Sequence, residues 1–124
     1  MSECFCDYDP ATFYSRREPK ARKVHQCEEC GHAIQAGEQY EKVVGKWDGD
    51  VSTFKTCRRC TALRDCMKAH LPCFCWAHGN LLGDCRDAYR ELPAEADGTG
   101  LTFEIGRLAV AIKRAPRYPT GAPT

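Results

Sequence analysis

The chain has 124 residues, of which 18 are basic and 17 acidic, giving a net charge of +1. This length suits one domain with a small core, and the balanced charge argues against a dedicated duplex-DNA-binding domain, which is usually strongly basic. The sequence shows no leader pattern and no apolar run approaching the ~18 residues of a membrane span. We therefore expect a cytoplasmic protein whose ten cysteines stay reduced, and metal binding is the natural reason to keep so many. Disulfides would be favoured only if a leader had been removed.

Residues 1–14 are expected to form an N-terminal arm that carries a Cys-Phe-Cys motif, and the same motif recurs further along the chain. Together the two motifs would offer four thiolates to a second zinc ion. The ligands of this second site would be Cys4, Cys6, Cys73 and Cys75. His78 follows Cys75 at a Cx₂H spacing and is an alternative ligand, and His70 lies close enough to serve. A packed or surface imidazole is the more ordinary role for either histidine.

Residues 13–25 hold the densest positive charge of the chain, next to Phe13 and Tyr14. The basic residues are Arg16, Arg17, Lys20, Arg22 and Lys23, to which Arg58 and Arg59 could add. An aromatic and basic strip of this kind suits single-stranded nucleic acid. The alternative is a solvated linker, which Pro19 and the missing apolar periodicity favour.

The central stretch 25–71 contains two CxxC pairs, Cys27/Cys30 and Cys57/Cys60. Each pair can present two thiolates on one tight turn, and four thiolates suit a tetrahedral Zn²⁺ at about 2.3 Å from each sulfur. Because four cysteines close the coordination shell, this first zinc is predicted to be structural.

A β-hairpin is predicted between the two pairs. Gly31 would let the chain turn after the first pair, and Asp48-Gly49 is a hairpin turn signal. Closing the hairpin there opposes Lys46 to Val51 and Val43 to Phe54. Alternation then places Val43, Trp47 and Phe54 on one face of the hairpin.

Three helices are predicted after the hairpin, over 61–71, 80–92 and 101–114. Apolar residues recur at helical spacing in each, and Pro72 and Pro93 end the first two. Cys66 and Cys85 fall on apolar helical faces and are expected to be free core thiols. The predicted fold class is a small α+β zinc-stabilised domain. Its predicted divisions are the arm 1–14, a zinc-binding core 15–92, a C-terminal helix 101–115 and a disordered tail 116–124.

The order of knuckle, hairpin and helix resembles the treble-clef and zinc-ribbon group, and CEECGHAIQAGEQY looks like a LIM-type knuckle. This resemblance covers roughly a third of the chain and implies a fold but no activity. The wider pattern CFCDYDP…GKWDGD…PCFCWAHGN resembles small uncharacterised cysteine-rich proteins of bacteriophages and prophages. That resemblance implies a protein acting in a bacterial cytoplasm, as a phage regulator or as an inhibitor of a host enzyme or defence complex.

Catalysis is not expected. A Cys75–His78 nucleophile and base would lack an orienting carboxylate or amide. An HNH-like nuclease needs a histidine base on the hairpin, and residues 39–56 contain no histidine. It is a lesser alternative that would require a rearranged site using His25 or His32. A hydrolytic zinc would need an open coordination position.

We therefore expect a non-enzymatic binding module with two zinc ions per chain. A protein partner is favoured, contacted through aromatic residues such as Trp47 and Trp76. The alternative is a nucleic-acid-binding zinc finger that uses segment 16–23 with Arg58 and Arg59. Neither the partner nor the oligomeric state follows from the sequence.

Overall fold

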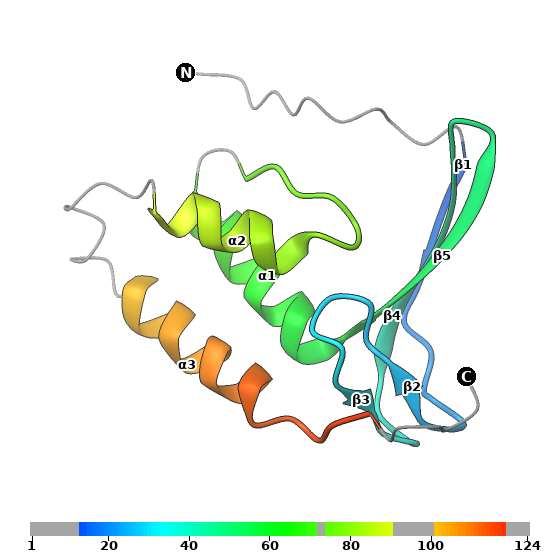
Figure 1. The fold of residues 1–124 in the computed structure, drawn as a ribbon, viewed down its shortest axis with the longest axis horizontal. Helices are drawn as coiled ribbons and strands as arrows, with labels where there is room; N and C mark the ends of the chain where they lie inside the picture. Colours follow the sequence, from blue (N-terminus) through cyan, green and yellow to red (C-terminus); the bar gives the residue numbers. More distant parts are fainter. Residues whose placement is uncertain (1–12, 72–73, 91–100, 119–124) are drawn as a thin grey trace.

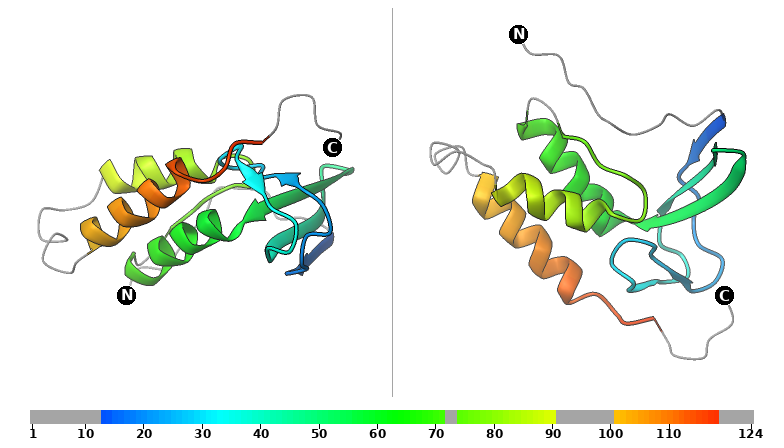
Figure 2. Two further views of the ribbon diagram at one scale, coloured as in Figure 1. Left: turned by 90° about the horizontal axis from the view of Figure 1, so that it is seen from below. Right: turned by 45° about the horizontal axis from the view of Figure 1, so that its top comes forward.

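The computed structural model describes residues 13–71, 74–90 and 101–118. These residues form a three-stranded sheet, a two-stranded knuckle and three helices. The elements in chain order are β1 (Phe13–Arg17), β2 (His25–Gln26), β3 (Ala33–Ile34), β4 (Tyr40–Trp47), β5 (Asp50–Cys57), α1 (Arg58–His70), α2 (Leu81–Arg90) and α3 (Leu101–Lys113). The strands make one half of the molecule and the helices the other, and α1 continues directly from β5 (Figures 1 and 2). The predicted α+β class is confirmed.

The hairpin β4–β5 has the register that the sequence predicts. Lys46 lies opposite Val51 and Val43 opposite Phe54. The chain reverses through Asp48 and Gly49, which have φ angles of 50° and 85°. Two successive positive φ angles are typical of the tight hairpin turn that matches the twist of the flanking strands.

Strand β1 differs from the sequence analysis, which offered only a linker or a basic strip for this segment. Residues 13–17 pair antiparallel with β4 and complete a sheet of order β1-β4-β5. The apolar pattern does not reveal this strand because one of its anchors is ionic. Arg16 donates a 2.7 Å hydrogen bond from Nε to Glu41, whose carboxylate is buried beneath the sheet.

The knuckle β2–β3 holds the first cysteine pair. Gly31 turns the chain with a φ of 76°, and its amide bonds to the Cys27 carbonyl at 3.0 Å. The Glu28 amide bonds to the Lys55 carbonyl at 2.8 Å and thereby ties the knuckle to β5. The glycine-assisted turn over the cysteines is as predicted.

Helix α1 begins at Arg58, three residues before the predicted start at 61, so Cys60 lies in its first turn. It ends at His70, and the Leu71 amide bonds to the Met67 carbonyl. Met67 is fully buried and packs in one core with the buried cysteines.

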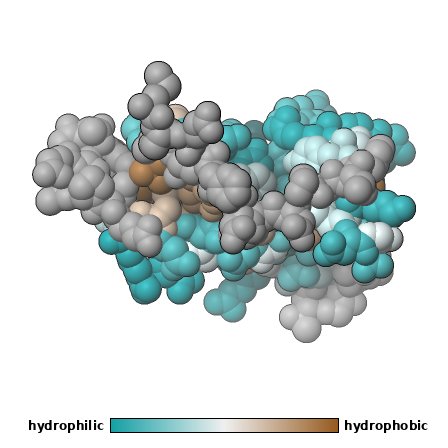
Figure 3. Space-filling view, turned by 90° about the horizontal axis from the view of Figure 1, so that it is seen from above, coloured by the Kyte–Doolittle hydropathy of each residue, from teal (hydrophilic) through white to brown (hydrophobic). Residues whose placement is uncertain are grey.

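Helices α2 and α3 both pack on α1. The apolar periodicity predicted for α3 is confirmed for Ile105, Leu108 and Ile112, which pack on the core. The side chain of Leu101 is not among those that the structure describes. Apolar surface gathers over the helical half, and the strand half is mostly hydrophilic (Figure 3). None of the helices in the described ranges combines the length and apolarity that crossing a bilayer requires.

The chain after α3 returns to the knuckle. Pro116 accepts a 2.8 Å hydrogen bond from the Ala33 amide, and Arg117 forms a β-bridge with His32. Residues 116 and 117 of the predicted tail therefore contact the knuckle through their backbone. Residues 119–124 lie outside the described ranges, and the predicted division of the whole chain into segments stays a prediction.

Candidate metal centre and basic hollow

Four cysteines from three parts of the fold meet at one point. Cys27 and Cys30 come from the knuckle, Cys57 from the end of β5 and Cys60 from the first turn of α1. Their sulfur atoms all lie within 4.8 Å of one another. These are the four residues that the two CxxC motifs predict.

The sulfur positions fit a tetrahedral zinc. Sulfur atoms at about 2.3 Å from a central Zn²⁺ are separated by about 3.8 Å along each edge of the tetrahedron. The Cys27–Cys60 and Cys30–Cys57 sulfur pairs are 3.9 and 3.8 Å apart. The four thiols could therefore hold a metal ion such as zinc, with all positions of the shell filled by protein.

The protein also compensates thiolate charge at this centre. The amides of Glu29 and Cys57 donate to the Cys27 sulfur at 3.4 and 3.3 Å. Hydrogen bonds from the neighbouring thiols, that of Cys30 first, and from the Cys57 amide hold the pKa of Cys27 below its ordinary value. Four thiolates this close repel one another, and a divalent cation removes that cost.

Glu29, between the two knuckle ligands, connects the centre to α2. Its carboxylate accepts hydrogen bonds from the amides of Gly79 and Leu81 at 3.1 and 3.2 Å. Leu81 is the first residue of α2, so its amide has no partner within the helix, and Gly79 lies two residues before it. A negative charge there also suits the positive end of the helix dipole. The knuckle thus caps a helix that lies fifty positions further along the chain.

The predicted second metal site lies mostly outside the described residues, which exclude Cys4, Cys6 and Cys73. Six described cysteines are free thiols, whereas Cys75 is disulfide-bonded. A disulfide and a zinc–thiolate bond are alternative states of one sulfur, so the second site stays a prediction. Of the two expected core thiols, Cys85 is buried and Cys66 is half-buried beside His70.

His78 lies in an aromatic cluster that the sequence analysis did not foresee. Its ring stacks on Phe54 at 4.9 Å and meets Trp47 and Trp76 edge-on at 6.1 and 4.6 Å. Burial lowers the pKa of His78 and favours the neutral imidazole. The two tryptophans expected on a binding face are therefore half-buried packing residues around this histidine.

A buried ion cluster lies under the same sheet. Arg64 of α1 donates from Nη1 and Nη2 to the two Glu41 oxygens at 2.7 and 2.8 Å. Its guanidinium also lies 5.1 Å from the centre of the Trp76 ring. Although burial alone would raise the pKa of Glu41, hydrogen bonds from Arg64 and Arg16 lower it. The only sequence signal for this cluster is a glutamate on the β4 face that otherwise carries Val43, Gly45 and Trp47.

A basic hollow forms where the sheet meets the knuckle. It has a volume of about 640 Å³ and is lined by Arg17, Pro19, Lys20, Arg22, Lys23, His25, Tyr40, Lys42 and Lys55. None of the described residues that line it is acidic. Among the described residues, none of its lysines or arginines forms an ion pair.

Three of these cations form a row across the sheet. Arg17 of β1 lies opposite Lys42 of β4, and Lys42 lies opposite Lys55 of β5. Directly opposed side chains point to the same face, so three like charges stand side by side. Burial, followed by the charges of Lys55, Lys23 and Lys42, lowers the pKa of the neighbouring His25.

The hollow includes only some of the basic residues singled out in the sequence. Arg16 pairs with Glu18 and Glu41 instead. Arg59 pairs with Glu38 and donates to the Ala33 carbonyl at 3.1 Å. The exposed Arg58 borders a separate hollow beside Glu18 and Glu41.

In comparisons with known proteins, no protein-family model, no curated protein and no solved structure matches the chain. The treble-clef and phage resemblances thus gain no support from relatives, and what the chain shows is a small α+β structure with a four-cysteine centre able to hold a metal ion.

Proposed function

We propose that this chain is a non-enzymatic, zinc-stabilised module that binds the phosphate backbone of nucleic acid through the basic hollow. The observation that carries the proposal is the row of Arg17, Lys42 and Lys55 across three adjacent strands. Like charges placed directly opposite each other destabilise a sheet. A polyanion bound across the row would offset that repulsion, because its phosphates attract all three cations.

The surroundings of the row support the proposal. Lys20, Arg22 and Lys23 line the same hollow from the segment between β1 and the knuckle. The charge is therefore local, which agrees with a chain whose net charge is only +1. The metal centre would fix the geometry, because the knuckle and β5 both border the hollow and both supply cysteines.

The proposal predicts a salt-dependent affinity for nucleic acid. Each phosphate neutralised on a single strand contributes about −0.7 to the slope of log K against log salt concentration. The triple substitution Arg17→Gln, Lys42→Gln and Lys55→Gln should therefore flatten that slope by about 2 and weaken binding at low salt. Fluorescence anisotropy with an oligothymidine of about twenty nucleotides, titrated over a range of NaCl, measures both quantities.

A matched control changes the same net charge elsewhere. Lys68, Arg90 and Arg114 are exposed cations of the helical half, and their replacement by Gln should leave the slope nearly unchanged. Parallel titrations with RNA and with duplex DNA identify the preferred nucleic acid. Absence of binding at low salt, or equal effects of the two triple variants, would remove the proposal.

A second candidate is the protein-binding module that the aromatic content favoured. The supporting observation is the outer face of α3, where Phe103 and Val110 are 75% and 45% exposed. They are seven residues apart and so share one face of the helix. A contiguous exposed apolar patch marks a site of protein contact, and these two side chains would be its apolar residues.

Its test is the substitution Phe103→Asp, which should abolish the capture of a partner from nuclease-treated bacterial lysate. The control Val51→Asp places the same charge at another exposed apolar position, on the hairpin, where Val51 is 66% exposed. If the Phe103→Asp variant still captures the partner, this face of α3 is excluded as the binding site. If nuclease treatment abolishes capture by the native chain, nucleic-acid binding is favoured instead.

A further inference from the structure

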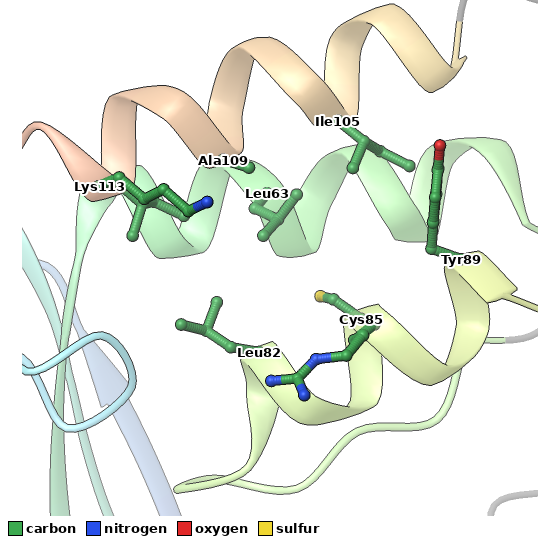
Figure 4. Close-up of a pocket in the computed structure, with 9 residues that line it drawn as sticks. Leu63, Leu82, Cys85, Tyr89, Ile105, Ala109 and Lys113 are labelled. Carbon is green, nitrogen blue, oxygen red and sulfur yellow. The ribbon is translucent and has the colours of Figure 1, made fainter.

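An apolar cavity lies between the three helices, away from both the metal centre and the basic hollow. It has a volume of about 290 Å³. Leu63 of α1, Leu82 of α2 and Ile105 and Ala109 of α3 form its walls (Figure 4). A concave apolar space with a few polar groups at its edge is the usual form of a small-molecule site.

Two cations border this cavity, and the lining residues within the described part of the chain include no acidic one. Arg86 and Lys113 are both exposed and line it from α2 and α3. Neither forms an ion pair with any residue of the described ranges. In Figure 4, Lys113 and Leu82 lie at one end and Ile105 and Tyr89 at the other. Arg86 lies one turn after Leu82 on the same face of α2, so the two cations line the cavity from different helices.

The interior is apolar enough to exclude charge. Burial raises the pKa of the Cys85 thiol, which lines the cavity, to about 12. A ligand with a charged group deep inside would lose its hydration without compensation. A charged group held at the rim would keep part of its hydration and would be compensated by the exposed lysine and arginine side chains.

We propose that this cavity binds a medium-chain aliphatic carboxylate, with its tail among the three helices and its carboxylate between Arg86 and Lys113. The argument is complementarity in both shape and charge: apolar walls for the tail, and two cations without acidic partners for the head. The cavity volume of about 290 Å³ is near the lower end of the range for small-molecule sites, about 300–1,000 Å³, so a medium-chain fatty acid such as decanoate is the matching probe. This site is independent of the proposed nucleic-acid surface.

Isothermal titration calorimetry of the zinc-loaded full chain with decanoate and 1-decanol tests the proposal. Decanoate should bind, and decanol, which has the same tail without the charge, should bind at least several-fold more weakly. Arg86→Gln and Lys113→Gln should each weaken decanoate binding by about three- to tenfold and leave decanol binding unchanged. Both side chains are exposed, so these variants should fold.

A substitution that fills the cavity tests where decanoate binds. Ala109→Trp should abolish decanoate binding, whereas Ala111→Trp, on an exposed position of the same helix, should not. Helical circular dichroism and zinc content establish that each variant is folded, and if Ala109→Trp fails that check the two charge variants decide. The proposal is overturned by no decanoate binding, by equal affinity for decanol, by charge variants that bind decanoate normally, or by a folded Ala109→Trp that still binds it.

Discussion

Cys60→Ser should leave the chain unfolded under conditions in which the native sequence is folded. Its sulfur is one of four within 4.8 Å, and it is fully buried between the knuckle and α1. Structural zinc contributes apparent binding free energies on the order of 10–16 kcal/mol at neutral pH. The free energy of unfolding of a domain this size is only about 5–15 kcal/mol, so a lost ligand removes most of it. Circular dichroism and zinc content of the purified variant measure the effect, and a strong chelator should reproduce it in the native chain.

Two other cysteines supply the controls. Cys66→Ala and Cys85→Ala remove thiols outside the four-sulfur cluster and should behave as modest truncations of about 1 kcal/mol with unchanged zinc content. The zinc count of the native chain is informative as well, because two ions per chain would support the predicted second site and one would remove it. A folded, zinc-free Cys60→Ser protein would refute the structural role of the centre.

Glu41→Gln should lower the free energy of unfolding by about 3–5 kcal/mol. The Glu41 side chain is 1% exposed and that of Arg64 only 7%. A glutamine amide cannot balance the buried guanidinium, which is left as an unpaired charge. Urea unfolding at neutral pH with saturating zinc measures the change.

Glu38→Gln is the matched control, because Glu38 pairs with Arg59 at 3.6 Å and both side chains are partly exposed. We expect that substitution to cost less than about 1 kcal/mol. Replacing both buried partners, Glu41→Leu with Arg64→Met, should recover part of the stability, because no buried charge is then left unpaired. The exposed Arg16 loses its bond to Glu41 but keeps its pair with Glu18. A cost for Glu41→Gln no larger than that for Glu38→Gln would show that the pair contributes little.

The same pair gives stability a defined pH dependence. The pKa of Glu41 is lower in the folded chain than its ordinary value, so the unfolded chain binds its proton first as the pH falls. The stabilisation is therefore complete above the ordinary carboxyl pKa and is lost as the pH falls toward the folded value. Glu41→Gln should lack this component of the acid-induced loss of stability.

The sequence predicted those features that are set by residues close together in the chain. The four ligands and the hairpin register follow from CxxC spacing and from Asp48-Gly49, each a local signal. The three helices follow from apolar periodicity, although α1 starts earlier because its first turn carries a ligand instead of an apolar residue. Local patterns were sufficient for these elements.

The remaining features depend on pairings between distant residues. Arg17 and Lys42 become neighbours only once β1 is known to pair with β4, and the β1 pattern of basic and aromatic residues does not reveal a strand. Glu41 and Arg64 meet across a sheet and a helix. The basic hollow and the buried ion pair were therefore beyond sequence reasoning, even though four of the six lysines and arginines that line the hollow had been singled out as basic.

Glu29 couples the unfolding of the knuckle to the unfolding of α2. Because this carboxylate sits between two sulfur ligands and also closes the start of α2, the helix cannot keep its cap once the knuckle has opened. Metal release should therefore spread beyond the turn that loses the ion. Knuckle and helix then melt as one cooperative unit, and hydrogen exchange in α2 becomes a remote sensor of metal occupancy.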